Sequence, residues 1–382
     1  MPEPFDMTLV QAGARLRRSP FFEAEQAYGP LGYTVYNHTL FPIRYDDLEA
    51  EYWHLLNHVT LWDVAVERQV EITGPDAFRF TQLLTPRDLT KCAVGQGKYV
   101  LITAPDGGIV NDPVSMRLGE NHFWLALADS DVLLYALGIA AVSDMKVEIR
   151  EPDVSPLQVQ GPYSKDVVRD LFGEQVLDLR YYFFTETDLD GIPVVVTRTG
   201  WTGEVGYEIY LRDGSRGTEL WERIMEAGRP YNIRPTGPSD IRRVEAGILN
   251  YGADMTLENN PYEVDLDRLV DLDKEDDFMG KEALERIRQH GVKRKLVGIE
   301  IGSERLSFND RKWPVRVGGQ DVGTVTSALY SPRLEKNIGY AWVPVEHAQL
   351  GSELQVETPL GDARAVVVPK PFVDPKKEIP KS

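Results

Sequence analysis

The C-terminal part of the chain places the strongest constraint on the fold. From about Lys293 onward helical patterns disappear, and glycine turns separate the strand-like segments KLVGIEI, NIGYAWVP and DARAVVV. Short strands joined by such turns are typical of a small closed β unit. We therefore predict a C-terminal β-barrel domain over residues 291–382, with a frayed tail, PKPFVDPKKEIPKS, at its end.

The region before it, residues 1–290, mixes strand and helix signals irregularly. VERQVEITG has a strand period, and PDAFRFTQLLT after it indicates a helix opened by Pro75 and Asp76. A second block repeats this mixture, with the strand-like SPLQVQGP before the helix-like SKDVVRDLF. The irregular order predicts an α+β region of two blocks, not a regular βαβ repeat.

Charge and composition exclude several classes of protein. The chain of 382 residues carries 42 basic and 60 acidic residues, and its net charge of -18 disfavours nucleic acid and anionic membrane surfaces. No window approaches the roughly 18 apolar residues of a membrane span, and MPEPFDMTLVQAGARLRRS lacks a signal-peptide core. The expected location is the cytoplasm, with neither nucleic acid nor membrane as partner.

Metal and nucleotide motifs are missing from the sequence. Cys92 is the single cysteine, so no intramolecular disulfide or cysteine cluster can form, and a buried apolar role is expected. His54 and His58 share helical spacing, but no acidic ligand sits at a matching offset. No dinucleotide, phosphate-loop or zinc-hydrolase motif is present either, so we expect no metal.

A predicted hairpin, GIPVVVT followed by RTGWTGEVGYEIYL, carries the densest chemistry. Alternation along the second strand puts Glu208 and Tyr210 on one face and Tyr207 on the other. Glycines around the turn bring Trp201 and Glu204 close to whatever occupies its mouth. The pattern suits either a hairpin whose aromatic residues support a sheet, or a carboxylate that accepts N–H donors from a flat heterocycle between aromatic rings.

This hairpin resembles a family signature. RTGWTGEVGYEIYL is similar to the R-T-G-Y-T-G-E-x-G-[FY]-E-I motif of the folate-dependent aminomethyltransferases, the T-proteins of the glycine cleavage system. Further segments resemble family segments in family order, namely LTPRDL, DGGIVNDPV, RRVEAGILNYGADMTLENNPYEVDL, FMGKEAL and VGTVTSALYSPRLEKNIGYAWVP. YTVYNHTLFP, LWDVAVERQVEITGPDA and ADSDVLLYA look most like the branch that contains dimethylsulfoniopropionate demethylases.

The resemblance implies a fold and a cofactor. The fold is α+β, three-part and ring-like, with residues 1–290 as a folate-binding catalytic region of two interleaved subdomains. Tetrahydrofolate, as methyl acceptor, is expected in a central channel. The expected cofactor contacts are Glu208, Arg243, Tyr99, Trp201 and Glu204.

One position bears on the chemistry. In the glycine cleavage T-proteins, the segment that matches DGGIVNDP ends in two aspartates, the first being the acid–base residue, whereas this chain has Asn111 followed by Asp112. An amide cannot relay protons, so Asn111 favours direct methyl transfer over aminomethyl chemistry. The catalytic candidates are Asn111, Asp112 and Tyr210, with Asp112 interpreted either as the proton-handling group or, preferably, as a turn residue.

A methylated onium donor would be held by aromatic faces, each worth about 0.5–2 kcal/mol. The substrate-binding candidates are Trp201, Tyr36 and Trp62, of which Tyr36 and Trp62 equally suit a core role. For a donor carboxylate the available cations are Arg17, Arg18 and Lys98.

Three functions follow from the resemblance. The first is a tetrahydrofolate-dependent demethylase that forms 5-methyltetrahydrofolate from dimethylsulfoniopropionate or a similar small donor. The second is an aminomethyltransferase-type transfer that gives 5,10-methylenetetrahydrofolate. The third is a non-catalytic folate-binding module, although KCAVGQGKY around Cys92 lacks the K-G-C-Y motif of such relatives. This chain also retains Glu204 in the T-G-E segment, which suits another onium donor. A homodimer is a possible assembly.

Overall fold

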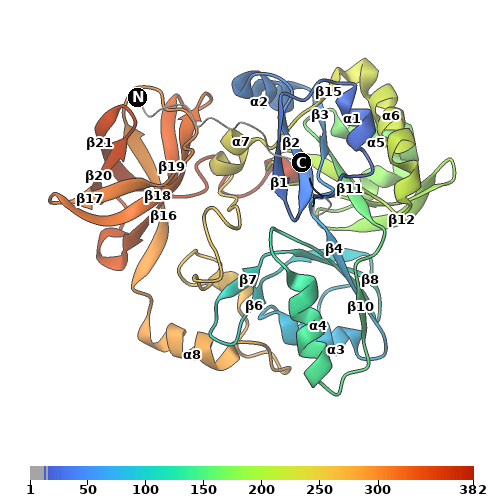
Figure 1. The fold of residues 1–382 in the computed structure, drawn as a ribbon, viewed down its shortest axis with the longest axis horizontal. Helices are drawn as coiled ribbons and strands as arrows, with labels where there is room; N and C mark the ends of the chain where they lie inside the picture. Colours follow the sequence, from blue (N-terminus) through green and yellow to red (C-terminus); the bar gives the residue numbers. More distant parts are fainter. Residues whose placement is uncertain (1–12, 14–15) are drawn as a thin grey trace.

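The computed structural model describes Gly13 and residues 16–382, so most of the N-terminal segment interpreted above lies outside the described residues. Three lobes surround the centre of the molecule (Figure 1). Two of them are α+β units and the third is a β-barrel. The chain passes back and forth between the two α+β units before it enters the barrel, because β3 and β11 belong to one sheet and β4 and β9 to the other.

The first unit is built on a six-stranded sheet with the order β12-β13-β14-β11-β3-β15. Its core combines the apolar faces of the helices with one sheet face, including Trp221 and Tyr207, which are fully buried. A two-stranded hairpin, β1–β2, and helix α2 complete this unit, and helix α7 lies between it and the barrel (Figure 1). The bounds are α1 Phe22–Gln26, β1 Gly32–Tyr36, β2 Thr39–Arg44, α2 Leu48–Asn57, β3 Val59–Asp63, β11 Ser155–Gln160, α5 Ser164–Phe172, β12 Phe184–Leu189, β13 Ile192–Thr197, β14 Gly206–Leu211, α6 Gly217–Gly228, β15 Ile233–Pro235 and α7 Asp240–Glu245.

The second unit is a five-stranded sheet with the order β10-β4-β9-β8-β5, next to the short pair β6–β7. Helices α3 and α4 pack on its apolar face through residues such as Phe80 and Val132. The strand over VERQVEITG and the helix after Asp76 are therefore where the sequence predicts them. The bounds are β4 Gln69–Thr73, α3 Ala77–Leu84, β5 Gln96–Tyr99, β6 Ile102–Thr103, β7 Ile109–Asn111, β8 Val114–Gly119, β9 His122–Ala126, α4 Val132–Val142 and β10 Glu148–Arg150.

The third unit is a closed barrel with the order β16-β19-β18-β17-β20-β21, reached through helix α8. Val315, Ala328 and Val356 lie in its fully buried interior. A second cluster, which includes Ile241, Leu296 and Tyr340, joins the barrel to the part of the chain that precedes it. The bounds are α8 Lys281–His290, β16 Arg294–Gly302, β17 Trp313–Val317, β18 Gln320–Ser331, β19 Lys336–Pro344, β20 Glu353–Thr358 and β21 Gly361–Val368.

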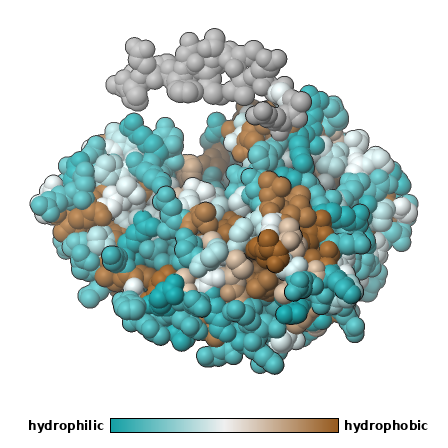
Figure 2. Space-filling model, turned by 60° about the horizontal axis from the view of Figure 1, so that its bottom comes forward, coloured by the Kyte–Doolittle hydropathy of each residue, from teal (hydrophilic) through white to brown (hydrophobic). Residues whose placement is uncertain are grey.

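Helix α4 presents an uncharged outer face. Leu134 is 67% exposed and Val142 is 87% exposed, and no charged residue occurs within the helix. Figure 2, in which the lower edge of Figure 1 comes forward, shows a hydrophobic area where this helix lies. Within the described residues, no helix is long and apolar enough to cross a membrane.

The C-terminal tail packs against the molecule, so the prediction of a frayed end is wrong. The backbone N–H of Val373 donates to Glu245 O at 2.9 Å, and Arg198 Nη2 donates to Pro380 O at 3.3 Å. Pro380 is buried. Composition alone missed this because the contacts are made with residues far away in the sequence.

Candidate active site

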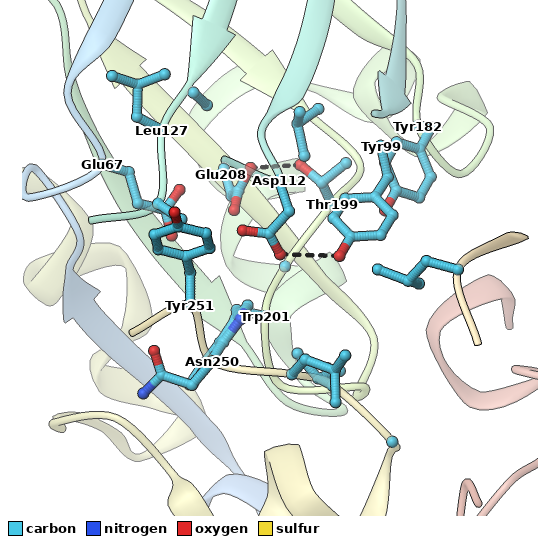
Figure 3. A pocket seen from close by; sticks show the side chains of 18 of the residues that line it. Glu67, Tyr99, Asp112, Leu127, Tyr182, Thr199, Trp201, Glu208, Asn250 and Tyr251 are labelled. Atoms are coloured by element: carbon cyan, nitrogen blue, oxygen red, sulfur yellow. Dashed lines mark hydrogen bonds between the residues drawn. The ribbon is translucent and has the colours of Figure 1, made fainter. Parts of the chain in front are cut away.

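A central pocket gathers side chains from both α+β units and from the C-terminal tail. It encloses about 990 Å³ of empty space, including solvent at its mouth. Figure 3 shows carboxyl groups in its middle and aromatic rings around them. The lining residues that bear on the chemistry are Tyr36, Glu67, Tyr99, Asp112, Tyr181, Tyr182, Thr199, Trp201, Glu208, Asn250, Tyr251, Arg268 and Lys377.

Glu208 lies on β14 and reaches the pocket from the sheet of the first unit. Its Oε1 accepts from Gln158 Nε2 at 2.7 Å, and its Oε2 accepts from Thr199 Oγ1 at 2.5 Å and from the Tyr210 hydroxyl at 3.0 Å. Burial raises its pKa, and the hydrogen bonds oppose that shift. The network fixes the carboxyl group, which is 5% exposed, at the pocket wall.

Asp112 supplies a second carboxyl group to the pocket. Tyr99 donates its hydroxyl to Asp112 Oδ2 at 2.8 Å (Figure 3). The other oxygen, Oδ1, is buried without a partner among the described residues. Burial raises the pKa of Asp112 to about 7. A carboxyl group that titrates near neutral pH inside a pocket is suited to proton transfer.

Glu67, between β3 and β4, is a third acidic residue of the pocket, and no local sequence motif indicates it. Burial raises its pKa well above the usual range, and the charges of Glu208 and Asp112 raise it further. Carboxyl groups that repel one another in this way hold protons until a cation arrives. The pocket is therefore suited to a positively charged ligand.

Aromatic rings form the walls. Tyr36, at the end of β1, and Trp201, in the turn before β14, both line the pocket as predicted, with Tyr251 opposite Tyr99 and Tyr182 (Figure 3). Trp62 does not line it, because it lies 3% exposed behind Trp201, with ring centroids 5.9 Å apart. The core interpretation of Trp62 therefore holds, and its binding role is wrong.

Asn111 does not face the pocket, which corrects the central argument from the sequence. Its Nδ2 donates to Ala128 O at 2.9 Å and Ser130 Oγ at 2.8 Å, and its Oδ1 accepts from Ala128 N at 3.0 Å. Neighbouring residues of an extended segment point to opposite sides, so Asn111 braces a loop while Asp112 enters the pocket. The interpretation of Asp112 as a mere turn residue is wrong.

Two predicted cofactor contacts are structural instead. Arg243 is fully buried, and its guanidinium donates to Asp240 Oδ1 at 2.9 Å, Asp254 Oδ2 at 2.8 Å and Ser327 Oγ at 2.9 Å. Glu204 accepts from Arg242 Nε at 2.6 Å. Both side chains are occupied in joining elements, and neither lines the pocket.

Tyr210 also stands behind the pocket lining. It is 1% exposed, and its hydroxyl bonds to Glu208, so it positions that carboxyl group and does not enter the pocket. The predicted alternation is confirmed, because Glu208 and Tyr210 share a sheet face while Tyr207 packs into the core on the other.

The cations at the pocket are Arg268 and Lys377, and the sequence analysis missed both. Arg17 pairs instead with Glu151 at 2.6 Å, and neither Arg18 nor Lys98 is a lining residue. Alternation along a strand would have placed the side chains of Asn111 and Asp112 on opposite sides. The other pocket residues that the sequence analysis missed occupy loops without a local motif.

Comparison with known proteins assigns the family. The GCVT N-terminal domain family matches residues 7–274, and the glycine cleavage T-protein C-terminal barrel domain family matches residues 294–374. The chain therefore belongs to the glycine cleavage T-protein family.

Individual relatives agree with this assignment. The chain is 42% identical to dimethylsulfoniopropionate demethylase DmdA from Ruegeria pomeroyi, over 96% of this chain and 100% of that one. It is 32% identical to an aminomethyltransferase from Bacillus cytotoxicus, over 94% and 98% of the two chains. The crystal structure of the glycine cleavage system aminomethyltransferase T from Bartonella henselae superimposes with a TM-score of 0.85 at 24% identity, covering 94% of this chain and 98% of that one, which confirms the fold.

Proposed function

We propose that this protein is a tetrahydrofolate-dependent demethylase. It moves a methyl group from dimethylsulfoniopropionate or a similar small onium donor to N5 of tetrahydrofolate. The observation that carries the proposal is the 42% identity to a dimethylsulfoniopropionate demethylase over that protein's whole length. The substitution at Asn111 no longer contributes, because its side chain does not reach the pocket.

The pocket residues fit a reduced folate. Glu208 offers a fixed carboxyl group to the paired N–H donors of a pterin, and Trp201 and Tyr251 offer flat faces beside it. Tetrahydrofolate, when bound, supplies the nucleophilic N5 that accepts the methyl group. Burial of Glu208 among its hydrogen-bond donors leaves it little freedom to move, so binding requires little reorganisation.

The acidic and aromatic groups fit a cationic donor. Glu67 and Asp112 ionise more readily beside a sulfonium or quaternary ammonium, and Tyr36 and Trp201 present aromatic faces to it. In the transfer the N5–C bond forms as the donor S–C bond breaks, the S–C electron pair stays on sulfur, and the sulfonium becomes an uncharged thioether. Asp112, whose pKa is about 7, can take the proton that methylated N5 releases.

One observation supports the second function, the aminomethyl-type transfer. Asp112 leaves an acid–base residue in the pocket, so aminomethyl-type transfer to 5,10-methylenetetrahydrofolate is chemically open. Product analysis separates the candidates. The purified protein is incubated with tetrahydrofolate and dimethylsulfoniopropionate, glycine betaine, dimethylglycine or vanillate, and the folate product is identified by mass spectrometry.

The folate product distinguishes the candidates. Accumulation of 5-methyltetrahydrofolate supports the demethylase and names its donor, whereas 5,10-methylenetetrahydrofolate alone refutes it in favour of aminomethyl-type transfer. Folate binding without either product indicates a donor outside the four tested or a non-catalytic module. The cytoplasm is our proposed location, and the homodimer stays a prediction that light scattering of the purified protein can test.

A further inference from the structure

Two carboxyl groups that do not line the central pocket are buried against each other in the first unit. Glu25, on α1, is 0% exposed, and Asp63, the last residue of β3, is 1% exposed. Their side chains hydrogen-bond to each other, and no basic side chain in the described part of the chain acts on either of them. Two ionised carboxylates in contact away from water would be strongly unfavourable. Glu25 and Asp63 are called the carboxyl pair below.

The hydrogen bonds around the carboxyl pair leave one oxygen without a donor. Glu25 Oε1 accepts from the Tyr33 hydroxyl at 3.1 Å. Asp63 Oδ2 accepts from Ser19 Oγ at 2.5 Å, and Asp63 Oδ1 accepts from Ala65 N at 2.9 Å. Glu25 Oε2 is buried and has no partner among the described residues. A proton on one of the two carboxyl groups supplies the donor that their contact requires.

The groups that face the carboxyl pair bring no positive charge to replace this proton. Tyr33 comes from β1 and Tyr45 from the segment after β2, and the Tyr45 hydroxyl is buried without a partner in the described chain. Glu51 of α2 lies next to Tyr45, since its Oε1 accepts from Tyr45 N at 2.5 Å. Leu157 of β11 and Trp221 of α6, which pack against β3 and α1, are uncharged. Among the described residues, the proton is therefore the one positive charge at the pair.

Burial raises the pKa of both members of the carboxyl pair, that of Glu25 to about 9 and that of Asp63 to about 6. After burial, the charge of Asp63 is the next cause that raises the pKa of Glu25. At neutral pH the pair therefore holds one proton. Because the usual pKa of Glu25 is 4.5, the contribution of this proton to the free energy of unfolding is complete below about pH 4 and is lost as the pH rises through 9.

The carboxyl pair connects the β1–β2 hairpin to the six-stranded sheet. The two strands of the hairpin form a sheet of their own, so side chains decide how the hairpin sits on its neighbours. Tyr33 of β1 bonds to Glu25, and Glu25 bonds to Asp63 of β3. Tyr36 ends the same strand as Tyr33 and lines the central pocket. The hydrogen bonds thus run from β3 through the pair to the strand that presents Tyr36.

We propose that Glu25 and Asp63 share one proton, and that this shared proton fastens the β1–β2 hairpin and positions Tyr36 at the pocket. Neither residue touches the ligands, so both are positioning residues. When the proton is lost, the two negative charges repel each other and the hairpin separates from β3.

Hydrogen exchange tests the proposal without any ligand. Glu25→Gln replaces the shared proton with a permanent donor, because the amide Nε2 can donate to Asp63 while Oε1 still accepts from Tyr33. Exchange of residues 32–44 is measured by mass spectrometry at pH 7, 8 and 9, and wild type and variant are compared at the same pH. Relative to the variant, the wild-type hairpin should lose up to about tenfold in protection for each pH unit.

Two further variants make this test specific. Glu23→Gln, on the same helix with a side chain that is 75% exposed, should keep the pH dependence of the wild type. Asp63→Asn also neutralises the pair and should abolish the dependence, which covers the case in which Glu25→Gln does not fold. The same pH dependence in the wild type and the neutralised variants, or a loss of protection that is equal across the molecule, would overturn the proposal.

The effect on Tyr36 is measured by turnover and rests on the proposed function. The KM for dimethylsulfoniopropionate should rise several-fold from pH 7 to 9 in the wild type and stay nearly constant in Glu25→Gln, with equal tetrahydrofolate affinities. Identical KM profiles would refute the positioning of Tyr36. Failure of the proposed function is distinct, because the wild type then forms no folate product at any pH, while hydrogen exchange still decides the role of the carboxyl pair.

Discussion

At the scale of single residues, Asp112 illustrates how function opposes stability. Its pKa is about 7 in the folded protein against a usual 3.8, so the folded chain holds a proton that the unfolded chain has lost. The contribution of this proton to the free energy of unfolding is complete below about pH 4 and is lost as the pH rises through 7. A neutral amide at this position would avoid that loss and keep the bond from Tyr99.

We therefore predict that Asp112→Asn is more stable than the wild type at pH 8, by about 1–3 kcal/mol, with a smaller gap at pH 5. Methyl transfer should fall by about 100-fold or more, because the proton acceptor is lost. Denaturant unfolding at both pH values and a single-turnover assay measure the two effects. If the difference in unfolding free energy between Asp112→Asn and the wild type did not increase with pH, Asp112 would not be the group that titrates near neutral pH.

Glu204 is a different case, because its partner is fully buried. Arg242 Nε lies 2.6 Å from Glu204 Oε1, and the Arg242 side chain is 0% exposed. Glu204→Ala leaves that buried guanidinium with only the more distant Glu245 carboxylate, at 3.8 Å, so we predict a loss of about 3–5 kcal/mol in the free energy of unfolding. The folate affinity of the protein that remains folded should stay near the wild-type value, since Glu204 does not line the pocket.

Two comparisons make this prediction specific. Glu226→Ala removes a carboxylate from an exposed ion pair with Arg229 and should change stability by less than about 1 kcal/mol. If Glu204→Ala weakened folate binding at a temperature where it is fully folded, the structural role argued here would be wrong and the original expectation of a cofactor contact would return.

At the scale of secondary-structure elements, the β1–β2 hairpin carries Tyr36 into the pocket. Its two-residue turn places Asn37 at φ 47° and His38 at φ 62°. Asn37 fastens this turn to the second unit, because its N–H donates to Asp129 Oδ1 at 2.9 Å and its Nδ2 donates to Ala128 O at 3.0 Å. The Asn37 side chain also donates from Nδ2 to Val66 O at 3.0 Å, so it contributes two of the bonds that hold the hairpin in place.

Asn37→Ala should loosen the hairpin and move Tyr36 away from the donor. We expect a loss of about 1–3 kcal/mol in stability and a donor KM raised several-fold, with folate affinity nearly unchanged. Asn57→Ala, which removes an exposed bond to Trp53 O, serves as the control. Equal changes in donor KM and folate affinity would show that the hairpin acts on the whole pocket and not on Tyr36 alone.

The elements also show what a sequence can predict. Local periodicity correctly indicated α3, α5, the β13–β14 hairpin and the strands of the barrel, because each buries one face over a regular repeat. The pocket was predicted only in part. Glu208, Tyr99, Trp201 and Tyr36 were identified, but Glu67 and Lys377 come from loops whose positions depend on packing between distant units.

At the scale of the whole molecule, the barrel is fastened to the catalytic region by a buried polar network. Arg243 on α7 donates to Asp254 and to Ser327 on β18, and the Tyr340 hydroxyl on β19 donates to Val244 O at 2.9 Å. The surrounding apolar cluster, with Ile241, Leu296 and Tyr340 among its members, combines residues of both regions. Neither region can lose this contact without exposing charged and apolar groups together.

We therefore predict that the chain unfolds in one cooperative transition, with equal calorimetric and van't Hoff enthalpies. Arg243→Met removes the cation that pairs with the buried Asp254 carboxylate, which should lower the free energy of unfolding by about 3–5 kcal/mol. We expect the transition to divide into separate steps for the barrel and the catalytic region. Lys336→Met, which breaks an exposed pair with Glu300 at 2.9 Å within the barrel, should leave one transition and nearly the same melting temperature. Two transitions already present in the wild type would mean that the barrel is an independent folding unit over residues 291–382, because the network then contributes too little to couple it to the pocket.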